Sequence, residues 1–175
     1  MPRNYVSLFG SAGDYLPVAA GATWLAAINT NFDVDVSAGN VQLRLRVAFT
    51  VTGGTGGTAF KWIYAKNGGA VTDITASSSN VKTFNSAHFA DADDVPQFLS
   101  SGTYVTNNNA AEESTGAFTL GTAIDVDEDV ESEIAIEVIA ADVAHANVLT
   151  FGIVEGDGTL FTTYTQFPSL LVIKT

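Results

Sequence analysis

The sequence contains no cysteine, and this absence removes three kinds of chemistry. Disulfide bonds, thiolate zinc sites and cysteine nucleophiles all require that residue. Histidine is almost as scarce, since His88 and His145 are the only two in 175 residues. Neither has a partner nearby in the sequence that would indicate a proton relay, so we expect both to be ordinary surface or edge residues.

Positive charge is the second shortage: 7 Lys and Arg stand against 19 Asp and Glu, which gives a net charge of −12. Proteins that bind nucleic acid use clustered Lys and Arg to replace counterions along the phosphates. Anionic membrane surfaces attract the same residues. We therefore expect neither nucleic acid nor a membrane as a partner. The acidic charge favours solubility. A more specific hypothesis is that the acidic residues bind cations or a basic partner.

Long apolar runs and catalytic motifs are also missing. The stretch Pro17–Ile28 is too short to cross a bilayer, and Arg3 alone is a poor start for a signal peptide. We expect a mature protein made in a cytoplasm. The sequence has no Gly-x-Ser-x-Gly or His-Glu-x-x-His motif, and its glycine-rich run Gly53–Gly57 is not followed by the Gly-Lys-Ser/Thr of a phosphate loop. We expect no enzymatic activity and no cofactor.

What the sequence does have is period-two alternation of apolar side chains, which is typical of β-strands. The clearest case is Val41–Val51, where the odd-numbered positions are apolar and share one face, while Arg44 and Arg46 lie on the other. One apolar face predicts a strand in a sheet that packs on another layer. Further strands are expected over Phe32–Val36, Phe60–Ala65, Val71–Thr75, Val81–Phe84, Ala117–Leu120, Glu133–Val138, Leu149–Ile153, Leu160–Phe167 and Leu170–Ile173.

About eight or nine strands with turn signals every ten residues or so predict an all-β fold, an antiparallel β-sandwich of jelly-roll or immunoglobulin-like type. The strongest turn signal is Asn67-Gly68, which favours a type I′ hairpin because that turn needs positive φ at both central positions. Residues 86–113 show no clear pattern. A helical turn over Ala87–Asp94 is the best interpretation there, and Pro96 discourages anything longer.

The first thirty residues differ from the β-sandwich domain that we expect over 31–175. Residues 1–30 are too apolar to stay disordered and too interrupted by Gly and Pro for a long strand. Two interpretations are open: a first strand with an irregular cover of the core, or an extended arm that lies on a partner subunit. In the arm interpretation, the contacts with the partner come from Tyr5, Leu8, Phe9, Tyr15 and Leu16.

The densest acidic cluster lies on the segment from Asp125 to Glu133. Spaced carboxylates can bind calcium, so Asp125, Asp127 and Asp129 are candidate metal ligands. The EF-hand pattern fails, because its glycine position is Val130 here. The alternation favours an exposed strand face, or a loop that enters a strand. A weaker cluster contains Asp91, Asp93 and Asp94.

Two aromatic residues, Trp62 and Tyr64, alternate along one expected strand. Aromatic side chains on a sandwich face can stack on sugar rings, so a carbohydrate-binding module is one hypothesis. A tryptophan on a central strand of a sandwich more often fills the core. We expect the core position for both residues.

Two segments resemble small structural proteins of tailed bacteriophages. In Phe60–Ala70 an aromatic strand runs into Asn-Gly-Gly, and a Thr- and Ser-rich return follows. In Glu133–Val143 an acidic and aliphatic strand precedes an Ala-Asp-Val connection. With the strands around them, these segments cover roughly residues 41–175, and neither contains a functional residue. The resemblance implies a virion component, namely a β-sandwich that decorates or cements a capsid, commonly as a homotrimer that clamps neighbouring capsid subunits.

We therefore expect a non-enzymatic virion protein that is assembled in the host cytoplasm. The implied partners are the major capsid protein or other virion subunits, held by burial of apolar surface across subunit boundaries. Two alternatives remain open at this point. One is a tail-associated module that binds a carbohydrate or a receptor, and the other is a tail-tube or other tail structural protein.

Overall fold

The computed structural model describes residues 5–11, 30–50, 59–86, 89–161 and 167–175, and it describes 5–11 by the backbone only. Strands account for the regular secondary structure of these ranges, which contain twelve strands and no helix. The expectation of an all-β chain is confirmed. In the described ranges, no helix is long and apolar enough to cross a membrane.

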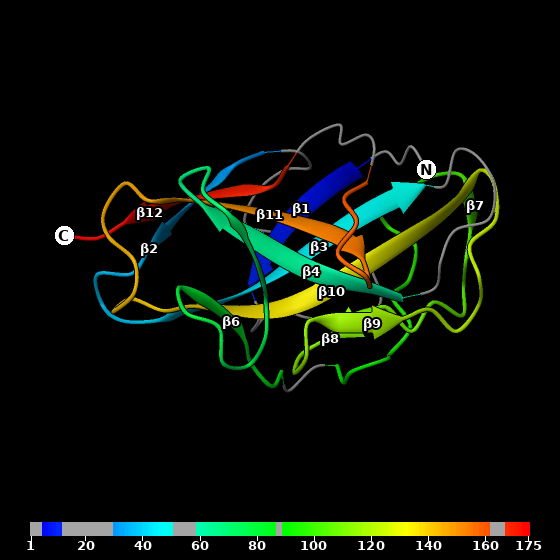
Figure 1. Ribbon diagram of the computed structural model, residues 1–175, viewed down its shortest axis with the longest axis horizontal. Helices are drawn as coiled ribbons and strands as arrows, with labels where there is room; N and C mark the ends of the chain where they lie inside the picture. Colours follow the sequence, from blue (N-terminus) through cyan, green and yellow to red (C-terminus); the bar gives the residue numbers. More distant parts are fainter. Residues whose placement is uncertain (1–4, 12–29, 51–58, 87–88, 162–166) are drawn as a thin grey trace.

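The strands form two sheets that pack face to face (Figure 1). Sheet A contains β1 (Tyr5–Ser11), β3 (Val41–Thr50), β6 (Val81–Thr83), β7 (Thr103–Tyr104), β8 (Ala111–Glu112) and β10 (Glu128–Val138). Sheet B contains β2 (Phe32–Asp35), β4 (Ala59–Lys66), β5 (Val71–Asp73), β9 (Ala117–Thr119), β11 (Val148–Glu155) and β12 (Ser169–Ile173).

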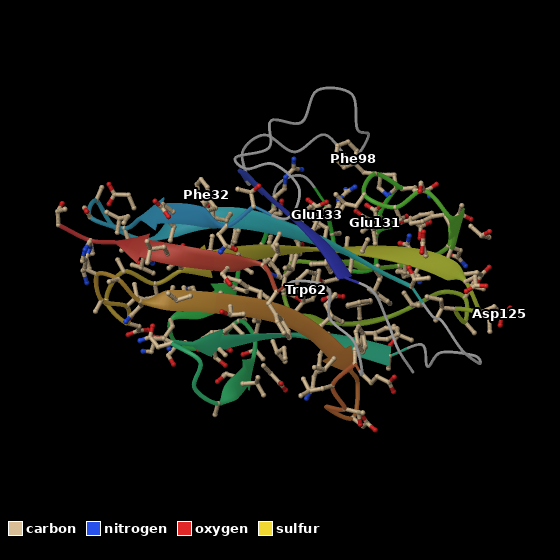
Figure 2. All side chains as sticks on the ribbon, turned by 90° about the horizontal axis from the view of Figure 1, so that it is seen from above. Phe32, Trp62, Phe98, Asp125, Glu131 and Glu133 are labelled. Atoms are coloured by element: carbon tan, nitrogen blue, oxygen red, sulfur yellow. The ribbon has the colours of Figure 1, made fainter. Side chains whose placement is uncertain are left out.

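The order of sheet A is β1-β3-β10-β6, and the short strands β7 and β8 also pair with β10. The order of sheet B is β2-β12-β11-β4-β5, and β9 also pairs with β4. Most neighbours are antiparallel, whereas β2 runs parallel to β12, and β7 and β8 run parallel to β10. In Figure 2 the layer with β4 and β11 (green and orange) lies below the layer with β3 and β10 (cyan and yellow). The arrangement is consistent with a β-sandwich.

The core lies between the two sheets and is rich in aromatic side chains. Trp62 and Phe60 of β4 and Phe49 of β3 are at most 1% exposed. The rings of Phe49 and Phe60 are 5.1 Å apart at an interplanar angle of 53°, and Phe118 lies 5.5 Å from Phe60. Tilted pairs of this kind are favoured by the ring quadrupole. The indole Nε1 of Trp62 donates a hydrogen bond of 3.1 Å to Ser132 Oγ, which ties sheet B to β10.

The predicted hairpin at Asn67-Gly68 is confirmed. Asn67 has a φ of 54° and Gly68 has a φ of 69°, and Gly69 N donates to Lys66 O at 3.0 Å. Positive φ at both central residues is what a type I′ turn requires. The side chain of Asn67 also accepts a hydrogen bond of 2.8 Å from Val148 N, so the turn is attached to the start of β11.

The long strand expected over Val41–Val51 is confirmed as β3 over Val41–Thr50, while Val51 lies outside the described ranges, and the second face of the strand is not open. Arg44 and Arg46 on that face are only 1% and 3% exposed. The cover comes from the segment between β6 and β9, because Arg46 Nη1 donates to Pro96 O at 3.1 Å and the Phe98 ring lies over the guanidinium. Strand β3 is therefore buried on both faces.

One local expectation is wrong over the residues that can be assessed, and a second is tested only in part. The segment Ala87–Asp94 contains no helical turn over 89–94, while residues 87 and 88 lie outside the described ranges. Of the return strand expected over Leu160–Phe167, the described residues show one bridge, between Leu160 and Val154, while 162–166 lie outside the described ranges. In the first segment, Ala92 has a φ of 65°, which a right-handed helical turn does not allow, and Asp93 Oδ2 accepts the backbone N–H of Ala90 at 2.9 Å.

The N-terminal residues are described only over Tyr5–Ser11, which form β1 at one edge of sheet A. This strand pairs with β3 along its whole length, from Tyr5 opposite Phe49 to Ser11 opposite Leu43. Of the candidate partner contacts, Tyr15 and Leu16 lie outside the described residues. The side chains of the other three candidates, Tyr5, Leu8 and Phe9, lie outside them as well.

Candidate functional site

The densest acidic cluster does not form the exposed face that the alternation predicted. Glu131 and Glu133 of β10 are fully buried, and Asp129 is 7% exposed. They lie on the outer face of sheet A, where Glu133 is directly opposite Arg46 of β3 and two pairs away from Arg44. A signal was present in the sequence, because two strands carried opposite charges at alternate positions, and such pairs attract across a sheet.

The charges meet in a compact cluster under the covering segment. Arg46 Nη2 and Nε lie 2.6 and 2.7 Å from Glu133 Oε2, and Arg46 Nη1 lies 3.4 Å from Glu131 Oε2. Arg44 Nη1 lies 3.4 Å from Glu133 Oε1. Burial raises the pKa of the Glu133 carboxyl, and the charges of Arg46 and Arg44 act against that rise. Sequence reasoning found these residues but not their contact.

Glu131 fixes the covering segment to the sheet. Its Oε1 accepts hydrogen bonds from the three consecutive backbone N–H groups of 98–100, at 2.6, 2.6 and 3.1 Å. The Phe98 ring lies 6.0 Å from the Arg46 guanidinium carbon, in a cation–π arrangement. Figure 2 shows Glu131 and Glu133 close together, with Phe98 above them. The carboxylate is engaged from within the chain, so the arrangement anchors a loop and does not present a general acid or base to a substrate.

The candidate metal ligands Asp125, Asp127 and Asp129 do not converge. Asp125 lies at one end of the sandwich (Figure 2), where its backbone N–H donates to Glu128 Oε2 at 2.8 Å. Asp127 occupies a turn with a φ of 60°. Asp129 lies on the outer face of sheet A and accepts the N–H of Gly102 at 3.0 Å. Among the described residues, no three His, Asp or Glu side chains gather to hold a metal ion.

The weaker acidic cluster organises the covering segment. Asp91 Oδ1 accepts the backbone N–H groups of Glu113 and Ser114 at 2.7 and 3.1 Å. Asp93 and Asp94 each accept one further backbone N–H, both at 2.9 Å. Burial alone would raise the pKa of Asp91. The hydrogen bonds that Asp91 accepts from Glu113 and Ser114 outweigh this effect, so the pKa is lowered overall. The three carboxylates act as caps for loop backbone.

Glu112 is a titratable residue that sequence reasoning missed, and nothing in its sequence context marks it. It is 3% exposed on the short strand β8, where Thr115 Oγ1 donates a hydrogen bond of 2.9 Å to its Oε2. Burial raises the pKa of Glu112 to about 8, against the effect of the Thr115 hydrogen bond. The neighbouring carboxylates of Asp91 and Glu113 raise it further. The carboxyl is therefore largely protonated at neutral pH.

Replacing Glu112 with glutamine is expected to make the folded chain more stable at high pH. Between pH 4.5 and about 8 the unfolded chain has released this proton and the folded chain keeps it. Stability therefore falls as pH rises through that window. Because solvent screens part of the effect, E112Q should raise the free energy of unfolding by about 2 kcal/mol at high pH and by almost nothing at low pH. Denaturant titrations at both ends of the window measure the difference, and an equal difference at both ends would contradict it.

The remaining candidates from the sequence are structural in the described residues. Trp62 and Tyr64 are 0% and 3% exposed, so the core expectation is confirmed and neither can stack on a sugar. His145 Nδ1 accepts the backbone N–H of Lys174 at 3.2 Å. His88 lies outside the described residues.

The feature most suited to binding is the outer face of sheet B, which sequence reasoning also missed. Paired residues of neighbouring strands share a face, so Val148 of β11 and Leu171 of β12 point outward together. Leu160 is bridged to Val154 on the same side, where Val154 itself is buried. Five large apolar side chains on this side are 37–59% exposed, and we call them the apolar face: Val71, Val148, Leu160, Phe167 and Leu171. Large apolar side chains exposed together on one face mark an interaction site.

Comparisons with family models, curated protein sequences and solved structures found no match to this chain.

Proposed function

We propose that this chain is a non-enzymatic structural protein of a virion, a capsid decoration protein that binds across neighbouring subunits of a phage head. The observation that carries the proposal is the apolar face of sheet B. Most large exposed apolar side chains of the described residues lie on it, while the buried acidic and basic groups are engaged in anchoring loops. A chain built this way offers a docking surface on a stably folded domain.

The mechanism is burial of the apolar face against another subunit. Each Å² of apolar surface removed from water stabilises a complex by about 25 cal/mol before the costs of association are subtracted. Stable subunit interfaces are larger and more apolar than transient ones. The buried charge cluster behind β3 and β10 supports the same role, because it holds the long covering segment on the opposite side of the sandwich.

For the finer fold type we propose the jelly-roll class. In immunoglobulin-like sandwiches the first two strands share one sheet. Here β1 lies in sheet A and β2 in sheet B, and β3 and β4 alternate between the sheets in the same way. Frequent crossing between layers favours the jelly-roll alternative.

We propose that the chain assembles as a homotrimer on the phage head. A location on the tail is the alternative that the particle assay can reveal. A sugar-binding role has no described aromatic pair to support it, because Trp62 and Tyr64 are buried. Light scattering on the purified chain measures the oligomeric state. A monomer at micromolar concentration would contradict the trimer.

The proposal is tested by sedimentation of native particles with the L171D variant. Leu171 is 37% exposed on the apolar face, so a charge there should leave folding within about 0.5 kcal/mol and greatly reduce the chain in the particle fraction. The matched control is V126D, because Val126 is 49% exposed on a loop outside the apolar face. A wild-type chain that stays with soluble host proteins, or equal loss in both variants, would contradict the proposal.

A further inference from the structure

The apolar face contains a depression whose floor is a glycine. Its volume is about 230 Å³, and it lies over β4, β5 and β11. The lining includes Ile63, Val71, Gly152 and Phe167, together with Gly68 and Gly69 at the β4–β5 hairpin. A cavity of about 150 Å³ holds a benzene ring in other proteins. The depression therefore has room for one aromatic or leucine side chain, and we call it the Gly152 depression.

The absence of a side chain at Gly152 creates this space. Gly152 is directly opposite Ile63 in the β4–β11 register, on the outward face. A Cβ atom placed there would lie 3.5 Å from Ile63 Cγ1 and 3.6 Å from Phe167 Cε1, which is ordinary van der Waals contact. Alanine thus fits at 152 without strain, whereas a longer side chain would occupy the space between Ile63 and Phe167.

Carboxylates outnumber cations among the described residues on the outer face of sheet B, on which the depression lies. Asp73 is paired with Ile63 on the same row of the sheet, and Asp33 is paired with Leu171 on the far side of the apolar face. Lys61 lies on this face too, but its Nζ is 2.8 Å from Asp73 Oδ2. Asp157 adds a further carboxylate near Lys61. Hydrogen bonds from Thr159 lower the pKa of Asp157 most, and the charge of Lys61 lowers it further.

This distribution of charge favours a basic partner over a second copy. Two copies placed face to face would bring the same carboxylates together, and each copy carries a net charge of −12. Like charges across an interface disfavour association, whereas a positive patch opposite a negative one speeds it. A partner segment with Lys or Arg on both sides of one apolar residue complements both the depression and its surroundings.

We propose that the Gly152 depression receives a single aromatic or leucine side chain from a basic segment of a different protein. The inference rests on the proposed function, since it names the chemistry of the partner at the same face. The inserted side chain acts as the anchor of the interface. Interface energy concentrates in such central anchors, which fill a pocket and are shielded from water by their neighbours. The flanking cations meet Asp33, Asp73 and Asp157.

The probe is the capped peptide Lys-Lys-Thr-Phe-Thr-Lys-Lys, titrated into the full ¹⁵N-labelled chain and followed by NMR. We expect shifts centred on the amides of Ile63, Val71 and Gly152. Peptides with Ala in place of Phe, or with Glu in place of every Lys, should bind at least about tenfold more weakly. Raising the salt from about 50 to about 500 mM should weaken binding of the first peptide. Shifts centred elsewhere, or equal binding of the Ala peptide, would overturn the inference.

The matched variants are G152L and G152A. G152L fills the depression from an outward position and should reduce peptide binding by at least about tenfold, while G152A should bind nearly as the wild type does. Unchanged binding by G152L would overturn the inference. If the wild type and G152L both sediment with particles in the particle assay, that result supports the structural role and rejects this docking mode. Peptide binding by a chain absent from particles rejects the structural role and retains the docking chemistry.

Discussion

Replacing Arg46 with methionine is expected to lower the free energy of unfolding by about 3–5 kcal/mol. The change leaves Glu131 and Glu133, both fully buried, without the guanidinium that contacts each of them. It also removes the hydrogen bond to Pro96 O and the contact with the Phe98 ring. Since a domain is stabilised by about 5–15 kcal/mol in total, the loss is a large fraction.

The matched control for this prediction is K61M, which breaks an ion pair of similar length on the surface. Lys61 and Asp73 are joined at 2.8 Å, but their side chains are 24% and 51% exposed. Exposed pairs of this kind contribute below about 1 kcal/mol. Urea unfolding of both variants measures the contrast. Equal effects would mean that the cluster behind β3 does not anchor the covering segment.

The second large effect is expected for W62A, which should cost about 3–5 kcal/mol. Trp62 is the largest fully buried side chain and packs between the sheets. Its removal leaves a cavity and takes away the hydrogen-bond donor of Ser132 Oγ, although that hydroxyl still donates to Ala110 O at 2.7 Å. The loss of packing should dominate, because the cavity is lined by rigid strands.

Thermal or urea unfolding of W62A tests the core assignment against the sugar-binding hypothesis. A ligand-binding aromatic residue on the surface would change stability by less than about 0.5 kcal/mol when replaced. The matched control is L160A, because Leu160 is 53% exposed on the apolar face. Near-equal stabilities of W62A and L160A would contradict the position of Trp62.

The parts of the fold that could be predicted are those set by local patterns. The alternation over Val41–Val51 and in the segment from Glu133 to Val138 indicated strands, because strand side chains alternate between faces with a period of two. The Asn67-Gly68 turn was predictable for a similar reason, since two adjacent residues specify its backbone. None of these signals depends on what lies far away in the sequence.

The parts that could not be predicted depend on contacts between distant segments. The alternating pattern of each strand placed Arg46 and Glu133 on the polar face. It did not indicate whether another segment covers that face. The cover is the segment 84–116, whose described residues form the two short strands β7 and β8 and loops held by side-chain caps such as Asp91. Glu112 was missed for the same reason, because it belongs to that segment and becomes buried only where β8 pairs with the distant strand β10.

The outer face of sheet B was also beyond local reasoning. The exposure of Val71, Val148 and Leu171 follows from the strand order β12-β11-β4-β5, which brings three separate parts of the chain side by side. A sequence shows that such residues are apolar, but not that they face outward together. The proposed function therefore depends on topology more than on any motif.

Hydrogen–deuterium exchange of particle-bound against free chain tests the docking face most directly. The account predicts added protection over β5 and over 167–171, which contribute Val71, Phe167 and Leu171 to the apolar face. Both segments lie at or next to the exposed surface of sheet B, so contact with a partner should slow their exchange. Unchanged exchange there, with added protection confined to the covering segment 84–116 on sheet A, would contradict the account.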